Sequence, residues 1–366
     1  QNHLERLRNF RVLDPACGSG NFLYLALKSL KDLEHAANID AQDLGLQRQV
    51  SIECSPANVL GIELDPYAAE LARVTVWIGE IQWMLKNGYA LAENPILKNL
   101  DHIQNRDALI EFLGKSEEGR EKGKTVRPEL AEGDVQLLPY ASIWPACAVI
   151  VGNPPFLGGS KKSGELGRDY FDAINQIYAQ HVPGGADLVC YWFHKARQQI
   201  AAGQAQRAGL VTTQSIRNGS NRKVLDAIVA DSPIFNAWSD EPWINDGAAV
   251  RVSLICFGVS HAGEARQLGS PVVGSASADQ IHDEQGKSAE ADPTVADGSA
   301  VLDGQPVARI NADLSAGGED LIDLTQAQPL PENAKTAFQG SQKIGAFDLP
   351  GEQARQMLVS GGNPNG

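Results

Sequence analysis

Short runs of apolar, β-branched residues alternate with longer amphipathic stretches from residue 11 to about residue 260 of this 366-residue chain. Such alternation predicts an α/β protein with a mostly parallel sheet and helices on both faces. Seven runs indicate seven strands, which begin near residues 11, 59, 102, 148, 209, 234 and 250. The connection between the last two is short enough for a hairpin, so one strand is expected to be antiparallel.

The stretch from 65 to 86 predicts a long helix. Asp65 suits the N-cap, and Pro66 suits the first helical position, where no backbone amide is needed. Large apolar residues recur there at helical spacing, and this stripe is predicted to face the core: Leu71, Val74, Ile78, Ile81 and Leu85. A second helix is expected after residue 186, with its aromatic run packed against the sheet.

The composition divides the chain into parts. A first domain is predicted over residues 1–260, with a charged, glycine-rich insertion at about 108–140 before the fourth strand. Residues 261–300 are rich in Ser, Ala, Gly and Asp without a period, as in a linker. A small hairpin is expected around Asp303 and Gly304. The chain starts ten residues before its first strand and stops without a finishing element, which favours a fragment of a larger protein.

The net charge of −14 does not by itself favour nucleic-acid binding, which normally needs a positive surface. The acidity is concentrated at one end, because residues 261–366 hold 15 acidic and 6 basic residues, whereas residues 1–260 hold 30 and 25. Basic residues of the first part gather in two glycine-rich segments: Lys161, Lys162 and Arg168 in one, and Arg217, Arg222 and Lys223 in the other. These segments are candidate contacts to a phosphate backbone, although solvated loops explain each one alone equally well.

Several function classes lack their motifs in this chain. The five cysteines form no Cys-x-x-Cys pair, and neither His-Glu-x-x-His nor Glu-x-Lys is present, so no disulfide scaffold, zinc site or common nuclease core is expected. No apolar run is long enough for a membrane span, and the chain does not open with a signal peptide. We therefore expect a cytoplasmic enzyme without a bound metal.

The segment 12–27 combines an apolar strand, an acidic residue, a glycine turn and a helix. Gly18 and Gly20 would let a ligand approach the backbone closely, and the free amides of the following helix point to the same place. A dinucleotide site would want a third glycine at Leu23 and no carboxylate at Asp14. S-adenosylmethionine carries an ammonium and no phosphate, so Asp14 suits its amino-acid end.

Two further acidic residues follow the second and third predicted strands. Glu63 ends the second strand, where a carboxylate can accept both ribose hydroxyls of a nucleoside. It lies 43 residues after Gly20, and an insertion around 38–57 would explain this long spacing. Asp107 follows the third strand and is suited to accept a hydrogen bond from an adenine amino group, although a helix N-cap would explain it equally well.

The fourth predicted strand stops at Asn153, followed by two prolines and Phe156. Each proline fixes its own φ and pushes the preceding residue toward extended geometry, so Asn153 is expected in a stiff turn. A surface loop rarely needs such rigidity, which indicates a functional role for the turn.

Together these motifs point to a family. DPACGSGNFL, GIELDP and GNPPF, followed by GLVTTQSIRNGSNR and AAVRVSLICFG, closely resemble the motifs of the amino-methylating DNA methyltransferases of bacteria. More narrowly, the chain is similar to the methyltransferase part of MmeI-like (type IIL) restriction-modification enzymes, in which endonuclease, methyltransferase and target-recognition regions share one chain. The resemblance covers about residues 10–260 and implies a Rossmann-like fold that uses S-adenosylmethionine. Residues 301–366 would then begin a truncated target-recognition region.

The resemblance also implies residue roles for methylation of the N6 amino group of an adenine flipped out of duplex DNA. Catalysis falls on Asn153, Pro154, Pro155 and Phe156. Cofactor contacts are implied for Asp14, Ala16, Gly18, Gly20, Phe22, Glu63, Leu64, Asp107 and Ala108. Contacts to DNA are expected from Lys161, Lys162, Arg217, Arg222 and Lys223.

Three alternatives stay open at this point. Asparagine at position 153 favours adenine N6 over cytosine N4 only as a tendency. An Asn-Pro-Pro-aromatic turn serves amide nitrogens equally well, so a methyltransferase acting on a protein glutamine or on RNA is a second interpretation. A degenerate scaffold that only helps a larger complex recognise DNA is disfavoured, because every catalytic position is intact. Methylation of cytosine carbon-5 is excluded, since the chain has no Pro-Cys dipeptide for its nucleophile.

Overall fold

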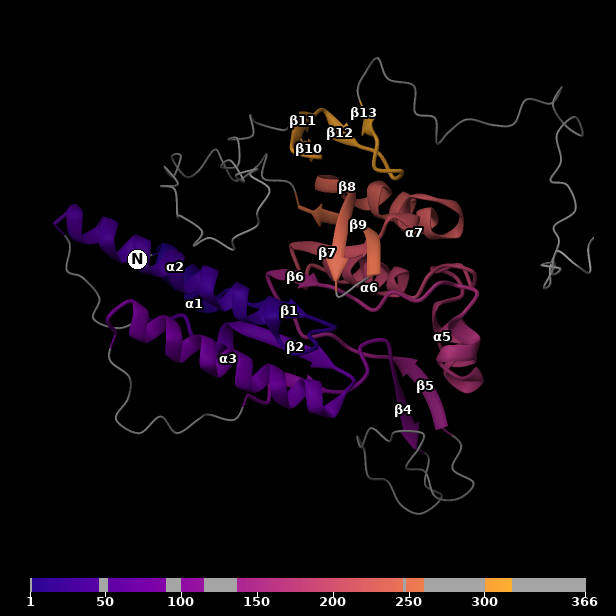
Figure 1. The fold of residues 1–366 in the computed structure, drawn as a ribbon, viewed down its shortest axis with the longest axis horizontal. Helices are drawn as coiled ribbons and strands as arrows, with labels where there is room; N and C mark the ends of the chain where they lie inside the picture. The colour runs from indigo at the N-terminus through magenta and orange to yellow at the C-terminus, as the bar shows by residue number, and fades with distance from the viewer. Residues whose placement is uncertain are drawn as a thin grey trace, which may run out of the picture. The chain divides into compact units, whose positions relative to one another are not determined.

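The computed structural model describes residues 2–45, 52–89, 100–114, 137–245, 248–259 and 300–317. The chain divides into two units, residues 1–322 and 323–366, and every described residue lies in the first. The centre of this unit is a nine-stranded sheet in the order β11-β10-β8-β9-β7-β6-β1-β2-β3 (Figure 1). The fold is therefore organised around one large sheet, as the alternating pattern predicts.

All seven predicted strands are present in this sheet. They are β1 (Val12–Asp14), β2 (Val59–Glu63), β3 (Ile103–Asn105), β6 (Val149–Gly152), β7 (Arg207–Thr213), β8 (Ile234–Asn245) and β9 (Ala248–Gly258). Neighbours from β3 to β7 pair in parallel, whereas β9 pairs antiparallel with both β7 and β8. The predicted fold class, with one antiparallel strand among these seven, is confirmed.

The sheet is wider than predicted, because a hairpin extends it beyond β8. β10 (Ala300–Leu302) and β11 (Gln305–Val307) turn at Asp303 and Gly304 as expected, and β10 pairs in parallel with β8. Two short strands, β12 (Arg309–Ile310) and β13 (Ala316–Gly317), form a separate antiparallel pair. Residues 261–299 and 318–366 lie outside the described part, so the linker and the target-recognition region stay predictions.

Helices cover both faces of the sheet. They are α1 (Asn2–Asn9), α2 (Asn21–Asp43), α3 (Pro66–Lys86), α4 (Lys162–Glu165), α5 (Arg168–Tyr178), α6 (Val189–Ala201) and α7 (Gly219–Asp231). Adjacent residues of β1 point to opposite faces. Val12 packs with Leu7 and Leu30 of α1 and α2, whereas Leu13 joins the cluster that contains α5, α6 and α7. Helices α2 and α3 lie side by side over the face of the sheet to which Val12 points (Figure 1).

Helix α3 begins as predicted, but its buried face differs from the prediction. The Asp65 side chain accepts a hydrogen bond from the amide of Ala68 at 2.8 Å, which confirms the N-cap. The large apolar stripe does not face the core, because Leu71, Val74, Ile78 and Leu85 are between 40% and 62% exposed, and its fifth member, Ile81, is half-buried. The buried positions are Ala69, Ala72, Val76, Gly79 and Trp83.

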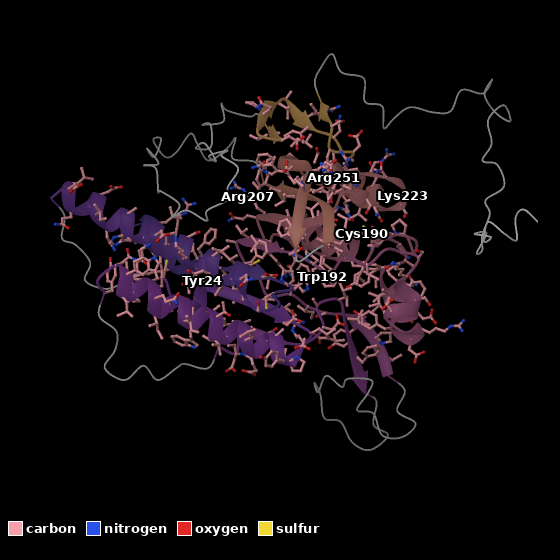
Figure 2. All side chains as sticks on the ribbon, viewed as in Figure 1. Tyr24, Cys190, Trp192, Arg207, Lys223 and Arg251 are labelled. Atoms are coloured by element: carbon pink, nitrogen blue, oxygen red, sulfur yellow. The ribbon has the colours of Figure 1, made fainter. Side chains whose placement is uncertain are left out.

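Close packing against α2 explains why small residues form the buried face of α3. A Cβ on Gly79 would lie 2.2 Å from the ring of Tyr24 on α2, whose side chain is labelled in Figure 2. Two helices approach this closely only where one of them carries small side chains. Helical spacing of large apolar residues therefore identifies the wrong side of this helix.

Two segments that were predicted to be loops contain strands. The segment between the last two predicted strands is itself paired, because Asn245 lies opposite Ala248 and both strands extend to that point. The predicted insertion begins and ends with an antiparallel pair, β4 (Ile110–Gly114) and β5 (Leu137–Ala141). Residues 115–136 between them lie outside the described part.

Candidate functional site

The carboxyl ends of four neighbouring parallel strands carry the candidate residues. Strands β6, β1, β2 and β3 lie side by side in this order. Asn153 follows β6, Asp14 ends β1 before the glycine turn, Glu63 ends β2, and Asp107 follows β3. A Cβ on Gly152, the last residue of β6, would lie 2.8 Å from Oδ1 of Asp14. The predicted cofactor and catalytic segments therefore meet at one edge of the sheet, as expected for open α/β sheets.

The turn between β1 and α2 is held from two sides. The amide of Gly18 donates to Oε2 of Glu63 at 2.8 Å, across the neighbouring strand end. On the other side, Nε1 of Trp192 on α6 donates to the carbonyl of Pro15 at 3.0 Å, and Trp192 is labelled in Figure 2. The turn is therefore fixed by hydrogen bonds of the protein itself, which lowers the ordering cost of ligand binding.

The two glycines of this turn have different reasons to be glycine. Gly18 has φ +51°, and a Cβ there would meet no atom within 4 Å. Gly20 has φ +88°, and a Cβ there would lie 2.9 Å from Cα of Ala72 on α3. Gly18 therefore borders open space that a ligand can fill, while Gly20 allows the turn to pack against α3.

Asp14 is buried and lies between the turn and β6. Its Oδ1 accepts a hydrogen bond from the amide of Ala16 at 3.0 Å, whereas its buried Oδ2 has no partner among the described residues. Burial raises the pKa of Asp14 to about 7. An unpartnered carboxylate oxygen at this position fits an approaching cation, such as the ammonium of an amino-acid moiety.

Glu63 uses both carboxylate oxygens to bind the backbone. Oε2 accepts from Gly18, and Oε1 accepts from the amide of Asp65 at 2.8 Å. Each carboxylate oxygen has two lone pairs, so each retains one acceptor position. Glu63 is half-buried and its neighbour Leu64 is 59% exposed, so a ribose could reach both.

Asp107 lies in the loop between β3 and β4 and organises that loop. Its Oδ1 accepts from the amides of Leu109 and Ile110 at 2.7 and 3.2 Å, and its Oδ2 accepts from the hydroxyl of Tyr170 at 2.8 Å. Burial raises the pKa of Asp107, although these hydrogen bonds oppose the shift. The neighbouring Ala108 is buried, whereas Ala16 in the glycine turn and Phe22 at the start of α2 are half-buried.

The turn after β6 differs from the glycine turn, because its side chains are open. Asn153 and Pro155 are exposed, Pro154 is buried, and Phe156 is 38% exposed. No hydrogen bond within the described part of the chain engages the Asn153 side chain. The amide of Leu188 donates to the carbonyl of Leu157 at 2.8 Å, so the backbone is anchored just after the turn. The polar atoms of Asn153 are therefore available to a ligand.

Asp187 joins the two glycine-rich segments, a role that the sequence did not reveal. Its Oδ1 accepts from the amide of Gly159 at 2.9 Å, and its Oδ2 accepts from the side chains of Ser215 and Asn221 at 2.7 and 2.8 Å. The Asp-Leu pair before an aromatic helix indicates only a helix start. Spatial proximity of two loops far apart in sequence has no local signal.

The five residues predicted to contact DNA differ in their exposure to solvent. Lys162 is fully buried, its Nζ lies 3.2 Å from the hydroxyl of Tyr191 and faces the rings of Tyr191 and Phe171, and burial lowers its pKa. The predicted phosphate contact of Lys162 is therefore wrong. Its neighbour Lys161 is exposed.

The second basic segment lies at η3 (Gln214–Arg217) and the start of α7. Lys223 is exposed on α7 and labelled in Figure 2, and Arg217 is half-buried. Arg222 is half-buried, and its Nε lies 3.8 Å from Oδ2 of Asp226, one turn further along the helix. These three side chains keep the exposure that a phosphate contact requires.

Among the described residues, His, Cys, Asp and Glu side chains form no group of three that could hold a metal ion. No helix in that same part of the chain is long and apolar enough to cross a membrane.

The sheet order and the glycine turn beside an acidic strand end define the Rossmann-like fold of S-adenosylmethionine-dependent methyltransferases. Within this class, the chain belongs to the MmeI DNA-methyltransferase family. The family model described as "MmeI, DNA-methyltransferase domain" matches residues 1–268.

Individual relatives agree with this family. The chain is 25% identical to DNA methyltransferase A of Bacillus subtilis (strain 168) over 272 residues, which are 70% of this chain and 27% of that protein. A putative type II restriction enzyme and methyltransferase of Methanocaldococcus jannaschii is 32% identical over 103 residues, covering 25% of this chain and 8% of that protein. Thus the chain spans about a quarter or less of these curated relatives.

Among solved structures, the chain resembles the type IIL restriction-modification enzyme MmeI, determined in complex with DNA. The two are 21% identical with a TM-score of 0.53, and the match covers 87% of this chain and 37% of that one. This likeness supports the fold.

Proposed function

We propose that this chain is the catalytic domain of a DNA methyltransferase that transfers a methyl group from S-adenosylmethionine to the N6 amino group of adenine. One observation carries the proposal. Asn153 follows β6 in a proline-stiffened turn with its side chain unengaged, and Gly152 beside it packs against Asp14 of the glycine turn. A hydrogen-bonding fork for an amine therefore adjoins the cofactor segment.

The chemistry needs positioning more than it needs a base. The lone pair of an exocyclic amine is delocalised into the adenine ring, so the nitrogen is a poor nucleophile. If Oδ1 of Asn153 and the carbonyl of Pro154 each accept one N–H, the nitrogen is drawn toward tetrahedral geometry and its lone pair is aimed. S-adenosylmethionine, when bound, supplies the electrophilic methyl group. In other enzymes, orientation and fixed dipoles together lower the activation free energy of such a step on the order of several kcal/mol.

Phe156 suits the flipped base. Its ring is partly exposed two residues after Pro154, and stacking on an extruded base repays part of the few kcal/mol that unstacking costs. The residue types of the cofactor segment fit S-adenosylmethionine. Asp14 Oδ2 is an unpartnered acceptor for the ammonium, Glu63 keeps two acceptor positions for the ribose, and Gly18 leaves space.

The wider protein is proposed to act on double-stranded DNA as part of a restriction-modification system in the cytoplasm. Endonuclease and target-recognition regions would be fused to this domain or accompany it. The relatives support this context, since one is named as a restriction enzyme and methyltransferase and another was determined with DNA. Lys161, Arg217, Arg222 and Lys223 are the proposed phosphate contacts, without Lys162.

The proposal is tested by transfer of labelled methyl groups from S-adenosylmethionine to unmethylated genomic DNA, with the full-length protein. We expect N6-methyladenine as the product, and we expect Asn153→Ala to lower the rate by about 100- to 1,000-fold, as loss of a transition-state hydrogen bond does elsewhere. Affinity for the cofactor should stay within about twofold, which is the control for folding. If the product is N4-methylcytosine, the methylated group is the N4 amine of cytosine and not the N6 amine of adenine. A near wild-type rate in Asn153→Ala would overturn the mechanism.

A further inference from the structure

The hydrogen bonds of Asp107 leave it with one free acceptor position. A carboxylate has about four lone-pair positions, two on each oxygen. The amides of Leu109 and Ile110 occupy both positions on Oδ1, and the hydroxyl of Tyr170 occupies one on Oδ2. Only the second position of Oδ2 remains for a ligand.

Tyr170 reaches Asp107 from a different part of the fold. It lies in the first turn of α5, which follows the catalytic turn and α4 in sequence, whereas Asp107 lies in the loop after β3. Burial raises the pKa of Tyr170 well above its usual range, so the hydroxyl stays protonated and acts as the donor. The side chain is only partly exposed, so water competes poorly for this bond.

We propose that Tyr170 is a positioning residue for the nucleobase of the cofactor, because it orients Asp107 so that one lone pair of Oδ2 accepts the exocyclic adenine amine. The inference rests on the proposed function, in which Asp107 contacts that amine. A hydroxyl bound to Oδ2 fixes the rotation of the carboxylate and keeps it an acceptor. The pocket then favours adenine, whose amine donates, over hypoxanthine, whose carbonyl oxygen only accepts.

The electrostatics around Asp107 agree with this role. Burial raises the pKa of Asp107, and the groups that face it oppose the shift: Tyr170 on α5 by its hydrogen bond, and Lys195 on α6 by its charge. Tyr178 on α5 also lies near Asp107, and its own pKa is raised. Removal of the Tyr170 hydroxyl should therefore raise the pKa of Asp107 further and make the protonated, poorly accepting form more common.

A matched control exists on the same helix. Tyr178 is buried two turns beyond Tyr170, and its hydroxyl donates to the carbonyl of Leu109 at 2.6 Å. Tyr178→Phe therefore removes a tyrosine hydrogen bond to the same loop without touching the carboxylate of Asp107. Comparison of Tyr170→Phe with Tyr178→Phe separates the positioning of Asp107 from a general loss of stability.

The experiment measures the affinity of the full-length protein for S-adenosylhomocysteine and for S-inosylhomocysteine, its hypoxanthine counterpart, between pH 5 and 8. Wild-type protein and Tyr178→Phe should prefer the adenine form by at least ~10-fold, and Tyr170→Phe should lose about tenfold of that preference. The acid limb of its affinity should also move to higher pH.

The outcomes separate two failures. An unchanged preference and an unchanged pH profile in Tyr170→Phe would overturn the role of Tyr170 alone. An equal loss of preference in both variants would also overturn it, because a structural effect would then suffice. If the wild-type protein binds neither nucleoside, the proposed function fails, and the inference that rests on it fails as well.

Discussion

Two turns at the same edge of the sheet are stabilised in opposite ways. The glycine turn after β1 is held by two hydrogen bonds: the Gly18 amide donates to Glu63, and the Trp192 indole donates to the Pro15 carbonyl. The turn after β6 has stiff prolines and an anchored backbone, but the Asn153 side chain is unengaged within the described part of the chain. One turn therefore has its shape before any ligand arrives, and the other keeps its polar atoms unpaired.

This difference suits what each turn is proposed to bind. A cofactor is bound in every catalytic cycle, and a preformed site lowers the cost of ordering it. An amine that must be held during reaction needs acceptors that no protein donor occupies, because electrostatic stabilisation depends on preorganised, unsatisfied dipoles. The comparison predicts that substitutions in the first turn change stability and cofactor affinity, whereas those around the second change the reaction rate.

The largest effect on folding is expected from the glycine turn. Gly20→Ala should lower the free energy of unfolding by about 3 kcal/mol, because a Cβ would meet the backbone of Ala72 at 2.9 Å and φ is positive. Gly18→Ala meets no atom and should cost about 1 kcal/mol from its backbone conformation alone. Its main effect should be loss of cofactor affinity.

Chemical denaturation together with calorimetric titration of S-adenosylmethionine checks both variants. The expected pattern is a large loss of stability in Gly20→Ala and a folded protein with weakened cofactor binding in Gly18→Ala. If both variants lose the same stability, the distinction between a packing glycine and a ligand-facing glycine is wrong.

A substitution of Asp187 tests the prediction for the turn after β6. In Asp187→Asn, the new amide nitrogen faces either the Asn221 side chain or the Gly159 amide, and both are donors. One contact is lost in either rotamer, so the link between Gly159, which follows the turn after β6, and the second glycine-rich segment should loosen. We expect kcat to fall about tenfold, which corresponds to ~1.4 kcal/mol, with cofactor affinity unchanged.

Asp303 provides the matched control, because it likewise accepts from an amide and a hydroxyl, both of Ser239, at 2.6 and 2.8 Å. It lies in the β10–β11 turn, where asparagine tolerates the positive φ of 51°. Asp303→Asn should leave kcat unchanged. A rate loss of equal size in the two variants would show that any loosened loop has this effect.

The sequence predicted those parts of the molecule whose signals are local. Seven strands followed from apolar runs, and the N-cap at Asp65 followed from Asp-Pro chemistry. The exposed side of α3 was misassigned, because the side that packs closely against Tyr24 has small residues and the largest apolar stripe faces outward. Lys162 was misassigned because a lysine in a glycine-rich loop indicates exposure, and only the fold surrounds it with Tyr191 and Phe171.

The predicted site depends on pH through Asp14. Burial raises its pKa from 3.8 to about 7, so the protonated form favours the folded protein. This contribution to stability is fully present below pH 3.8 and is lost as the pH rises through 7. An ammonium beside Asp14 would favour the ionised form instead, so cofactor affinity should rise with pH up to about 7, by at most tenfold per unit.

Calorimetry at pH 6.5 in two buffers of different ionisation enthalpy measures the proton released when S-adenosylmethionine binds. Wild-type protein should release a proton, and Asp14→Asn, which cannot ionise, should not. Equal proton release by the two proteins would assign the pH dependence to another group.

The smallest expected effect separates two adjacent lysines. Lys161, which follows the proposed catalytic turn in sequence, is exposed, whereas Lys162 is buried against Tyr191 and Phe171. Lys161→Met should reduce the slope of log affinity for DNA against log salt by about 0.9, the value for one lost phosphate contact. Lys162→Met keeps the apolar packing and removes the buried ammonium together with its contacts to Tyr191 and Phe171, so it should leave the slope unchanged. Filter binding at several salt concentrations measures both slopes, and a change of equal size in the two variants would mean that Lys162 leaves its buried position when DNA binds.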